Sequence, residues 1–159
     1  MEEMTIETKR LKITPASDAQ MEDLVEKQTI PELKKAYQEM LDGALTHPDE
    51  RVWYAVWNIE LNDAPGVTIG DLSFKGIDQT GIVEIGYGMH SEFEGKGYMT
   101  EAVTAVAQWA YSQPCVKAVE AETDPDNIAS QRVLEKAGFA PTGEQGEEGP
   151  RFVWQGDAK

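Results

Sequence analysis

The sequence predicts an α+β domain whose central sheet is mixed and mostly antiparallel. Three strand-like runs, residues 52–61, 67–77 and 82–89, are separated by short turns, a pattern typical of an antiparallel meander. After residue 89 the pattern changes to helix, strand and helix. A helix between two strands indicates a crossover that makes those strands parallel or nearly so. The 159 residues contain no linker, repeat or low-complexity tract, so residues 1–159 are expected to form one domain.

The N-terminal third is predicted to contain an edge strand and two helices. Residues 5–14 alternate weakly and lead to a proline, which suits the edge of a sheet. Ser17 or Asp18 can cap a first helix that runs to about residue 28. A second helix, residues 31–45, begins with a proline in its first turn and repeats apolar residues at helical spacing.

The C-terminal half is predicted to alternate helices and strands. In order these are a helix over 100–113, a strand over 116–122, a helix over 127–137, a strand from 139, a loop over 143–150 and a strand over 151–155. Gly138 follows the second of these helices directly. It suits a C-terminal cap, because glycine adopts the left-handed conformation that such caps need.

Composition and charge narrow the class of protein. Apolar residues make up 40% of the chain, enough for a core, yet no apolar run reaches the roughly 20 residues that span a bilayer. The N-terminus carries no apolar signal segment, and Cys115 is the only cysteine. We therefore expect a cytoplasmic protein without membrane contact, in which that cysteine is buried or half-buried. The formal net charge of −15 argues against a nucleic-acid partner; it could favour cationic substrates such as amines, although solubility alone also explains it.

The segment 94–102, Glu-Gly-Lys-Gly-Tyr-Met-Thr-Glu-Ala, joins a predicted strand to a predicted helix. Gly95 and Gly97 allow a tight turn and a close approach of the backbone to a ligand. The helix start directs unpaired N–H groups and its positive dipole end at this turn. Strand, glycine turn and helix start together predict a site for a phosphate or pyrophosphate. Thr100 and Glu101, in the first turn of that helix, are candidate caps.

The strand over residues 82–89 alternates strictly. The residues predicted to face the core are Val83, Ile85, Tyr87 and Met89. On the other face Gly86 and Gly88 leave a groove that a ligand can enter, with Glu84 beside it. A carboxylate there would be partly desolvated, with a raised pKa suited to a general base. A solvent-exposed glutamate explains the pattern equally well, so both interpretations stay open.

The helix over 127–137 carries the other candidate groups. Asn127 stands at its N-cap position. Ser130 occupies the first place on an inward-facing stripe that is otherwise apolar. The other members of this stripe are Val133, Leu134 and Ala137. The Ser130 hydroxyl therefore needs a partner, which could be a bound cofactor or a carbonyl of its own helix.

No metal site and no nucleophilic triad are predicted. His47 and His90 have no cysteine or carboxylate neighbours at metal-ligand spacing. No serine, histidine and aspartate follow the order of a known triad, and Cys115 has no partner that would activate it.

Four motifs occur in order along almost the whole chain. They are Glu-Thr-Lys-Arg-Leu at 7–11, Glu-Ile-Gly-Tyr at 84–87, Gly-Lys-Gly-Tyr-Met-Thr-Glu-Ala at 95–102, and Asn-x-x-Ser-x-Arg-Val-Leu-Glu-Lys-x-Gly-Phe at 127–139. Together they resemble the GCN5-related N-acetyltransferase (GNAT) family. The resemblance is closest to its branch of ribosomal-protein N-terminal acetyltransferases, of the RimJ and RimL type. The motifs are similar to that branch's opening strand, central strand, pyrophosphate loop and closing motif.

The resemblance implies a fold and a ligand. It implies a sheet of about seven strands with about four helices on both faces, and acetyl-CoA as co-substrate without a metal. The strands 82–89 and 116–122 would splay so that pantetheine lies between them. The residues expected to contact the cofactor are Met89, Gly95, Lys96, Gly97, Tyr98, Met99, Thr100, Asn127 and Ser130. A main-chain N–H near Met89 would polarise the thioester carbonyl.

The resemblance also implies acetyl transfer to a primary amine by direct attack in a ternary complex. The acceptor would be a small amine or a protein N-terminus. Glu84 would take up the amine's proton through a water, Ser130 would donate to the departing thiolate, and Asn127 would hold the pantetheine arm or a water.

Two residues depart from the pattern of the family. Glu94 places an anion beside the predicted pyrophosphate site, so its side chain is expected to point to solvent. Leu134 stands where many relatives carry a tyrosine that acts as general acid, which leaves that role to Ser130.

Three questions stay open in the sequence. A non-catalytic module that senses acyl-CoA also fits the glycine turn. The identity of the acceptor would depend on the segments 18–45 and 143–150, which resemble nothing general. The protein could be a monomer or a homodimer. Four aromatic residues would mark a dimer face or an acceptor site if they were exposed: Trp53, Tyr54, Trp57 and Trp154.

Overall fold

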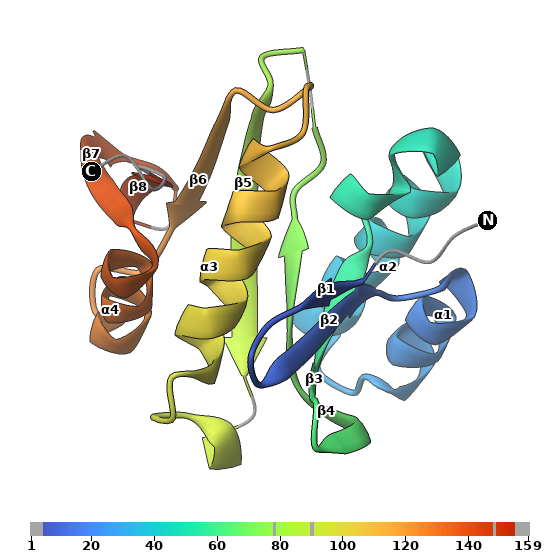
Figure 1. Ribbon diagram of the computed structural model, residues 1–159. Coiled ribbons are helices and arrows are strands. Elements are labelled where there is room, and N and C mark those ends of the chain that lie inside the picture. Colours follow the sequence, from blue (N-terminus) through green and yellow to red (C-terminus); the bar gives the residue numbers. More distant parts are fainter. Residues whose placement is uncertain (1–4, 78, 90, 148, 155–159) are drawn as a thin grey trace.

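The computed structural model describes residues 5–77, 79–89, 91–147 and 149–154. Its strands are β1 (Ile6–Glu7), β2 (Leu11–Pro15), β3 (Val56–Leu61), β4 (Ala64–Phe74), β5 (Ile82–Met89), β6 (Ala118–Glu122), β7 (Phe139–Gln145) and β8 (Pro150–Trp154). They form one eight-stranded sheet in the order β1-β2-β3-β4-β5-β6-β8-β7 (Figure 1). Neighbouring strands are antiparallel except for β5 and β6, which are parallel. The predicted α+β fold with a mixed, mostly antiparallel sheet is confirmed.

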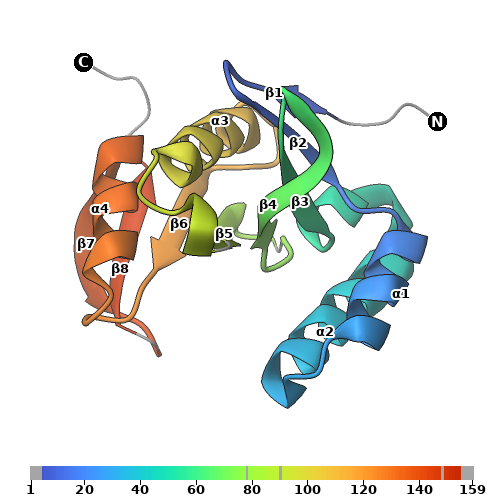
Figure 2. The same ribbon diagram turned by 90° about the horizontal axis from the view of Figure 1, so that it is seen from below.

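Helices cover both faces of this sheet. In the described part of the chain they are α1 (Asp18–Lys27), α2 (Pro31–Thr46), α3 (Tyr98–Tyr111) and α4 (Ile128–Ala137), with two short 3₁₀ helices, η1 (Pro48–Trp53) and η2 (Ser91–Phe93). α3 and α4 lie on one face of the curved sheet, and α1 and α2 lie on the other (Figure 2). Of the two predicted caps of α1, Ser17 is the N-cap, and it forms a capping box with Gln20 in which the two exchange hydrogen bonds between side chain and backbone.

Two cores hold these layers together. The larger lies between α3 and the sheet and includes the fully buried Phe74. The smaller lies beneath α1 and α2 and includes Met21 and Leu41. Removing this apolar surface from water is the main driving force for folding. Three of the tryptophans are buried: Trp53, Trp57 and Trp154. They therefore do not supply an exposed dimer face or acceptor site.

The N-terminal segment differs from the single strand predicted over residues 5–14. β1 and β2 form an antiparallel hairpin, closed by a turn in which the Thr8 N–H donates to the Leu11 carbonyl. The Asn62 side chain donates to the Thr8 carbonyl and holds this turn against the next hairpin. The sequence pattern could not show the turn, because this contact comes from a residue far along the chain.

Two further expectations were wrong. The strand predicted from residue 52 begins only at Val56, since residues 48–53 form η1. Packing of Trp53 against Phe74 and Trp109 overrides the strand propensity of this aromatic stretch. Cys115 is exposed, because it lies in the turn between α3 and β6 and not in a strand.

The parallel strands β5 and β6 separate halfway along β5. Their pairing joins residues 82–85 to residues 118–121 and then ends. β5 stays paired with β4 up to Met89, whereas β6 continues beside β8 up to Glu122. Residues 86–89 therefore lie along an open edge of β5, in the gap between the two strands (Figure 1). The splay implied by the family resemblance is present.

Candidate active site

The glycine turn before α3 has the predicted shape. Gly95 and Gly97 both have a φ of 80°, in the left-handed region that favours glycine. Gly97 is the N-cap, so α3 begins at Tyr98 and not at residue 100. Within the described part of the chain, no side chain caps this helix start. Its first N–H groups and the positive end of its dipole are thus available to an anionic ligand.

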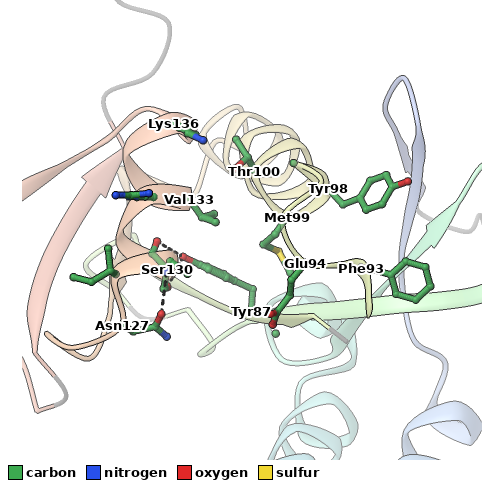
Figure 3. A pocket seen from close by; sticks show the side chains of 16 residues that line it. Tyr87, Phe93, Glu94, Tyr98, Met99, Thr100, Asn127, Ser130, Val133 and Lys136 are labelled. Atoms are coloured by element: carbon green, nitrogen blue, oxygen red, sulfur yellow. Dashed lines mark hydrogen bonds between the residues drawn. The ribbon is translucent and has the colours of Figure 1, made fainter. Parts of the chain in front are cut away.

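A cavity of about 490 Å³ lies beside this helix start and is called the first cavity. Its walls come from the end of β5, the glycine turn, the first turn of α3 and one face of α4 (Figure 3). The lining residues are Tyr87, Gly88, Phe93, Glu94, Gly95, Gly97, Tyr98, Met99, Thr100, Asn127, Ile128, Ala129, Ser130, Arg132, Val133 and Lys136. Arg132 and Lys136 are exposed cations on α4. They stand four residues apart, so they share one face of the helix.

The two cations were not among the residues predicted to contact a cofactor. Their spacing on α4 was the available signal, since Arg132 and Lys136 both belong to the closing motif. With the uncapped α3 start opposite them, the first cavity combines partial and full positive charges. That combination suits a ligand with several phosphate groups.

Arg10, in the turn between β1 and β2, braces the glycine turn from outside. It donates to the Lys96 carbonyl at 3.0 Å, forms an ion pair with Glu101 at 2.7 Å, and stacks over the Tyr98 ring at 4.4 Å. Glu101 also accepts hydrogen bonds from the Thr8 hydroxyl and the Arg10 N–H. Glu101 was expected to cap α3, but it instead ties the start of the helix to the N-terminal hairpin.

Glu101 makes the stability of this brace depend on pH. Burial alone would raise the pKa of Glu101, but hydrogen bonds from Thr8 and Arg10 outweigh burial and lower it below the ordinary 4.5. A carboxylate with a lowered folded-state pKa stabilises the fold above its unfolded pKa, and loses that effect as the pH falls through its folded pKa.

Glu101→Gln should therefore reduce the free energy of unfolding at neutral pH. The difference from wild type should shrink when urea unfolding is repeated at about pH 3. A deficit independent of pH would contradict this role.

A larger cavity of about 1000 Å³ lies on the other side of the open strand edge and is called the second cavity. Residues of α2, β4, β5 and the end of β6 form most of its wall. The carboxylates that line it are Asp71, Glu84, Glu122, Asp124 and Glu147, and Lys75 is its lining cation. Tyr37 of α2 donates to Asp71 at 3.1 Å. Burial, and after it the Asp71 carboxylate, raises the pKa of Tyr37 to about 12, so its phenol stays protonated.

The two cavities meet at a shared wall. The residues that line both are Tyr87, Gly88, Asn127 and Ser130. Asn127 is the N-cap of α4, as predicted, and its Oδ1 accepts from the Ser130 N–H at 3.0 Å. Ser130 Oγ lies 2.8 Å from the Tyr87 hydroxyl, which also reaches the Ser130 carbonyl at 3.1 Å (Figure 3). Ser130 on α4 thus has a partner on strand β5, Tyr87, in addition to the two options considered from the sequence.

Tyr87 was predicted to face the core, and this expectation was only half right. It shares a strand face with the buried Val83 and Ile85, but its side chain is half-buried. β6 has already left β5 at this level. The side chain packs against the edge of the larger core, and its hydroxyl reaches across the gap to α4. Alternation alone cannot show where the neighbouring strand ends.

Glu84 lies in a charge network at the floor of the second cavity. Its two oxygens contact Lys75 at 2.9 Å and Arg151 at 3.2 Å. Arg151 also pairs with Glu120 at 2.8 Å and with Glu122. Hydrogen bonding to Glu120 leads the causes that raise the pKa of Arg151, and it outweighs burial. Arg151 therefore remains charged and joins three carboxylates of β5 and β6 to β8.

The structure brings most of the predicted site residues together, but not all of them. Gly95, Gly97, Tyr98, Met99 and Thr100 line the first cavity, whereas Glu84 lines the second cavity and not the first. The exposed Lys96 is not among the lining residues; it contributes its carbonyl to Arg10. Met89 ends β5 beside the glycine turn. The exposed Glu94 stands at the rim of the first cavity, and the buried Leu134 carries no polar group to it.

The described residues contain neither a membrane-spanning helix nor a group of side chains that could hold a metal ion. No helix there has the length and apolar character needed to span a membrane. Over the same ranges, no cluster of histidine, cysteine or carboxylate side chains could hold a metal ion. His90, considered above as a metal ligand, lies outside the described residues.

Comparisons with known proteins agree with this geometry. A family model described as an acetyltransferase (GNAT) domain matches residues 8–140. The probable N-acetyltransferase YjcK of Bacillus subtilis (strain 168) is 35% identical over 107 residues, which are 67% of this chain and 55% of that protein. The chain spans about half the length of the curated relatives it matches.

Solved structures share the fold at low sequence identity. One is RimL, a ribosomal L7/L12 alpha-N-protein acetyltransferase in complex with coenzyme A, with a TM-score of 0.71, 18% identity, and coverage of 94% of this chain and 97% of that one. Another is the microcin C7 self-immunity acetyltransferase MccE in complex with acetyl-CoA and AMP, with a TM-score of 0.66, 15% identity, and coverage of 92% of both chains. At these identities the likeness shows the fold alone.

Proposed function

The chain belongs to the acetyltransferase (GNAT) domain family, and from that premise we propose that it transfers the acetyl group of acetyl-CoA to a primary amine in a ternary complex. The observation that carries the proposal is the shared wall of the two cavities, made by Tyr87, Gly88, Asn127 and Ser130. A donor in the first cavity and an acceptor in the second would meet there. Holding both reactants in contact replaces a bimolecular encounter by a local one.

The first cavity would hold CoA. Backbone N–H groups from Gly95 to Thr100 would bind the pyrophosphate at the uncapped start of α3. Arg132 and Lys136 would lie near the phosphate charges. The pantetheine arm would follow the open edge of β5, residues 86–89. A main-chain N–H near Met89 would polarise the thioester carbonyl.

The second cavity would hold the acceptor amine. Among the described residues, five carboxylates and one lysine line it, so its electrostatic potential favours a positively charged ligand. An amine is protonated at neutral pH and would enter as its ammonium form. Both a small amine and a protein N-terminus meet this requirement. The acidic lining supports a cationic acceptor, but it does not distinguish a small amine from a protein N-terminus.

The proposed chemistry uses three side chains. Glu84, the carboxylate of β5 in the second cavity, would receive the ammonium proton through a water, and its contacts with Lys75 and Arg151 would hold it in place. The amine would then attack the thioester carbon and form the C–N bond, and as the C–S bond breaks the nitrogen would lose its second proton to solvent water. Ser130 would donate a hydrogen bond to the sulfur that leaves. The Oδ1 atom of Asn127 accepts a hydrogen bond from the Ser130 N–H. The side-chain amide nitrogen of Asn127 would therefore hold pantetheine or a water.

One assay tests this function. The protein is mixed with acetyl-CoA and a panel of amines and short peptides, and free thiol is followed over time. We expect acetyl-CoA-dependent thiol release with at least one cationic acceptor. Binding of CoA without turnover on any acceptor would favour the alternative, a module that senses acyl-CoA. Absence of CoA binding would exclude both.

Glu94 should weaken cofactor binding, because it places an exposed carboxylate at the rim of the first cavity. We expect Glu94→Gln to lower the Kd for CoA by about threefold at low salt, with a smaller gain at high salt because ions screen exposed charges. Titration calorimetry at two salt concentrations measures both effects. The matched control is Glu92→Gln, since Glu92 is also exposed but does not line the cavity. An equal gain in both variants would show that only overall charge matters.

A further inference from the structure

Tyr87 places a phenol hydroxyl where the two cavities meet. Its oxygen lies 2.8 Å from Ser130 Oγ and 3.1 Å from the Ser130 carbonyl oxygen (Figure 3). The side chain is half-buried and lines both cavities. Two contacts with one residue fix the phenol relative to α4. The phenol is therefore positioned for a role in the chemistry assigned to Ser130.

The backbone explains why the phenol can reach this place. β6 no longer pairs with β5 beyond residue 85, so no strand covers the edge beside Tyr87. Its neighbours Gly86 and Gly88 carry no side chain, and a Cβ built at either position would meet no atom within 4 Å. The hydroxyl thus lies in an uncrowded gap that a ligand can enter.

The protonation state of Tyr87 suits a hydrogen-bond donor. Burial raises the pKa of its phenol, and the hydrogen bond with Ser130 only partly opposes that effect. The phenol is therefore neutral at neutral pH and carries one proton that it can donate. The buried Leu134 offers no such proton from α4.

We propose that Tyr87 is a positioning residue that directs the Ser130 hydroxyl proton at the departing sulfur. The proposal rests on the function proposed above. The two hydroxyls can exchange roles, because either Tyr87 or Ser130 can be the donor across their 2.8 Å contact. At rest, the Tyr87 proton is donated to the Ser130 carbonyl, and the Ser130 proton is donated to Tyr87.

The roles exchange when the thiolate leaves. As the C–S bond breaks, the sulfur takes the electron pair and becomes an anion. The Ser130 proton rotates toward the sulfur, and the Tyr87 proton rotates toward Ser130 Oγ. Neither O–H bond breaks, so the two hydroxyls stabilise the thiolate as hydrogen-bond donors and transfer no proton to it. When the Tyr87 hydroxyl donates to Ser130 Oγ, the Ser130 proton is free to bond the sulfur. The same hydrogen bond makes Ser130 a stronger donor.

The first test measures the thiol of bound CoA and needs no acceptor. In a Cys115→Ser background CoA carries the only thiol, because Cys115 is the only cysteine. The pH dependence of alkylation gives the pKa of the bound thiol. Donors aimed at the sulfur stabilise the thiolate, so wild-type protein should lower this pKa below that of free CoA. Ser130→Ala and Tyr87→Phe should both return it toward the free value.

Tyr111→Phe is the matched control, because Tyr111 is exposed and lies outside both cavities. It should leave the pKa of the bound thiol unchanged. If Tyr87→Phe binds CoA and melts like wild type, yet keeps the wild-type pKa of the bound thiol, the role of Tyr87 is overturned. That result would leave the proposed function intact. Failure of the wild type to bind CoA would overturn both.

The second test uses turnover with any acceptor that the thiol-release assay finds. Loss of one hydrogen bond in Tyr87→Phe should lower kcat about tenfold and leave the KM for acetyl-CoA unchanged. Ser130→Ala should lower kcat about 100-fold. The double variant should be no slower than Ser130→Ala, because Tyr87 acts through Ser130. Additive losses, or a loss confined to KM, would overturn the proposal.

Discussion

Gly95→Val should weaken CoA binding by about 100-fold, measured as a Kd by titration calorimetry. Gly95 has a φ of 80° and lines the first cavity beside the uncapped start of α3. A β-branched residue avoids this conformation, so the turn would relax and its N–H groups would no longer converge on the pyrophosphate. Strain of about 1–2 kcal/mol together with a lost charge-assisted hydrogen bond accounts for the expected factor.

Gly66→Val separates this effect from simple backbone strain. Gly66 has a φ of 89°, and like Gly95 it has open space where a Cβ would stand. It lies on β4 and lines neither the first nor the second cavity. Its valine variant should lose stability while keeping the wild-type Kd for CoA. A similar loss of binding in both variants would mean that the glycine turn has no special part in the site.

Arg151→Leu should destabilise the protein by about 3 kcal/mol, seen as a fall in Tm of about 6–12 °C. The Arg151 side chain is 19% exposed and joins Glu84, Glu120 and Glu122. Removing the cation takes away the guanidinium that three partly buried carboxylates share, although Lys75 still contacts Glu84.

Arg51→Leu is the control for losing an arginine. Arg51 pairs with one carboxylate, Asp18, whose side chain is 48% exposed, and it also donates to the Ala16 carbonyl. Water and ions screen such a pair, so we expect a loss of about 1 kcal/mol or less. Equal losses in the two variants would show that the three-carboxylate network around Arg151 adds nothing special to stability.

Local patterns allowed much of the site to be predicted. Gly95 and Gly97 were recognised because few residues tolerate the turn before α3. Asn127 was recognised as an N-cap, and Ser130 was recognised because helical spacing places it at the start of an otherwise apolar stripe. In each case the deciding interactions lie within one turn or one helix. The α+β fold could be predicted for the same reason, because hydrophobic periodicity and turn residues mark most of its helices and strands.

Long-range partners could not be predicted. Arg10 contacts Glu101 across 91 residues of sequence, and Arg151 contacts Glu84 across 67. Tyr87 and Ser130 are 43 residues apart and meet only because β5 and β6 separate. A side chain's partner depends on which strands end where, and neither residue type nor spacing contains that information. For this reason the charge network around Glu84 could not be predicted from the sequence.

The most direct test is a crystal structure of the protein with bound CoA. We expect the pyrophosphate within hydrogen-bond distance of N–H groups between Gly95 and Thr100, at the uncapped start of α3. We expect the sulfur at the wall shared by the two cavities, beside Ser130 Oγ and the Tyr87 hydroxyl. CoA bound away from the start of α3, or with its sulfur remote from Ser130, would contradict the proposed site.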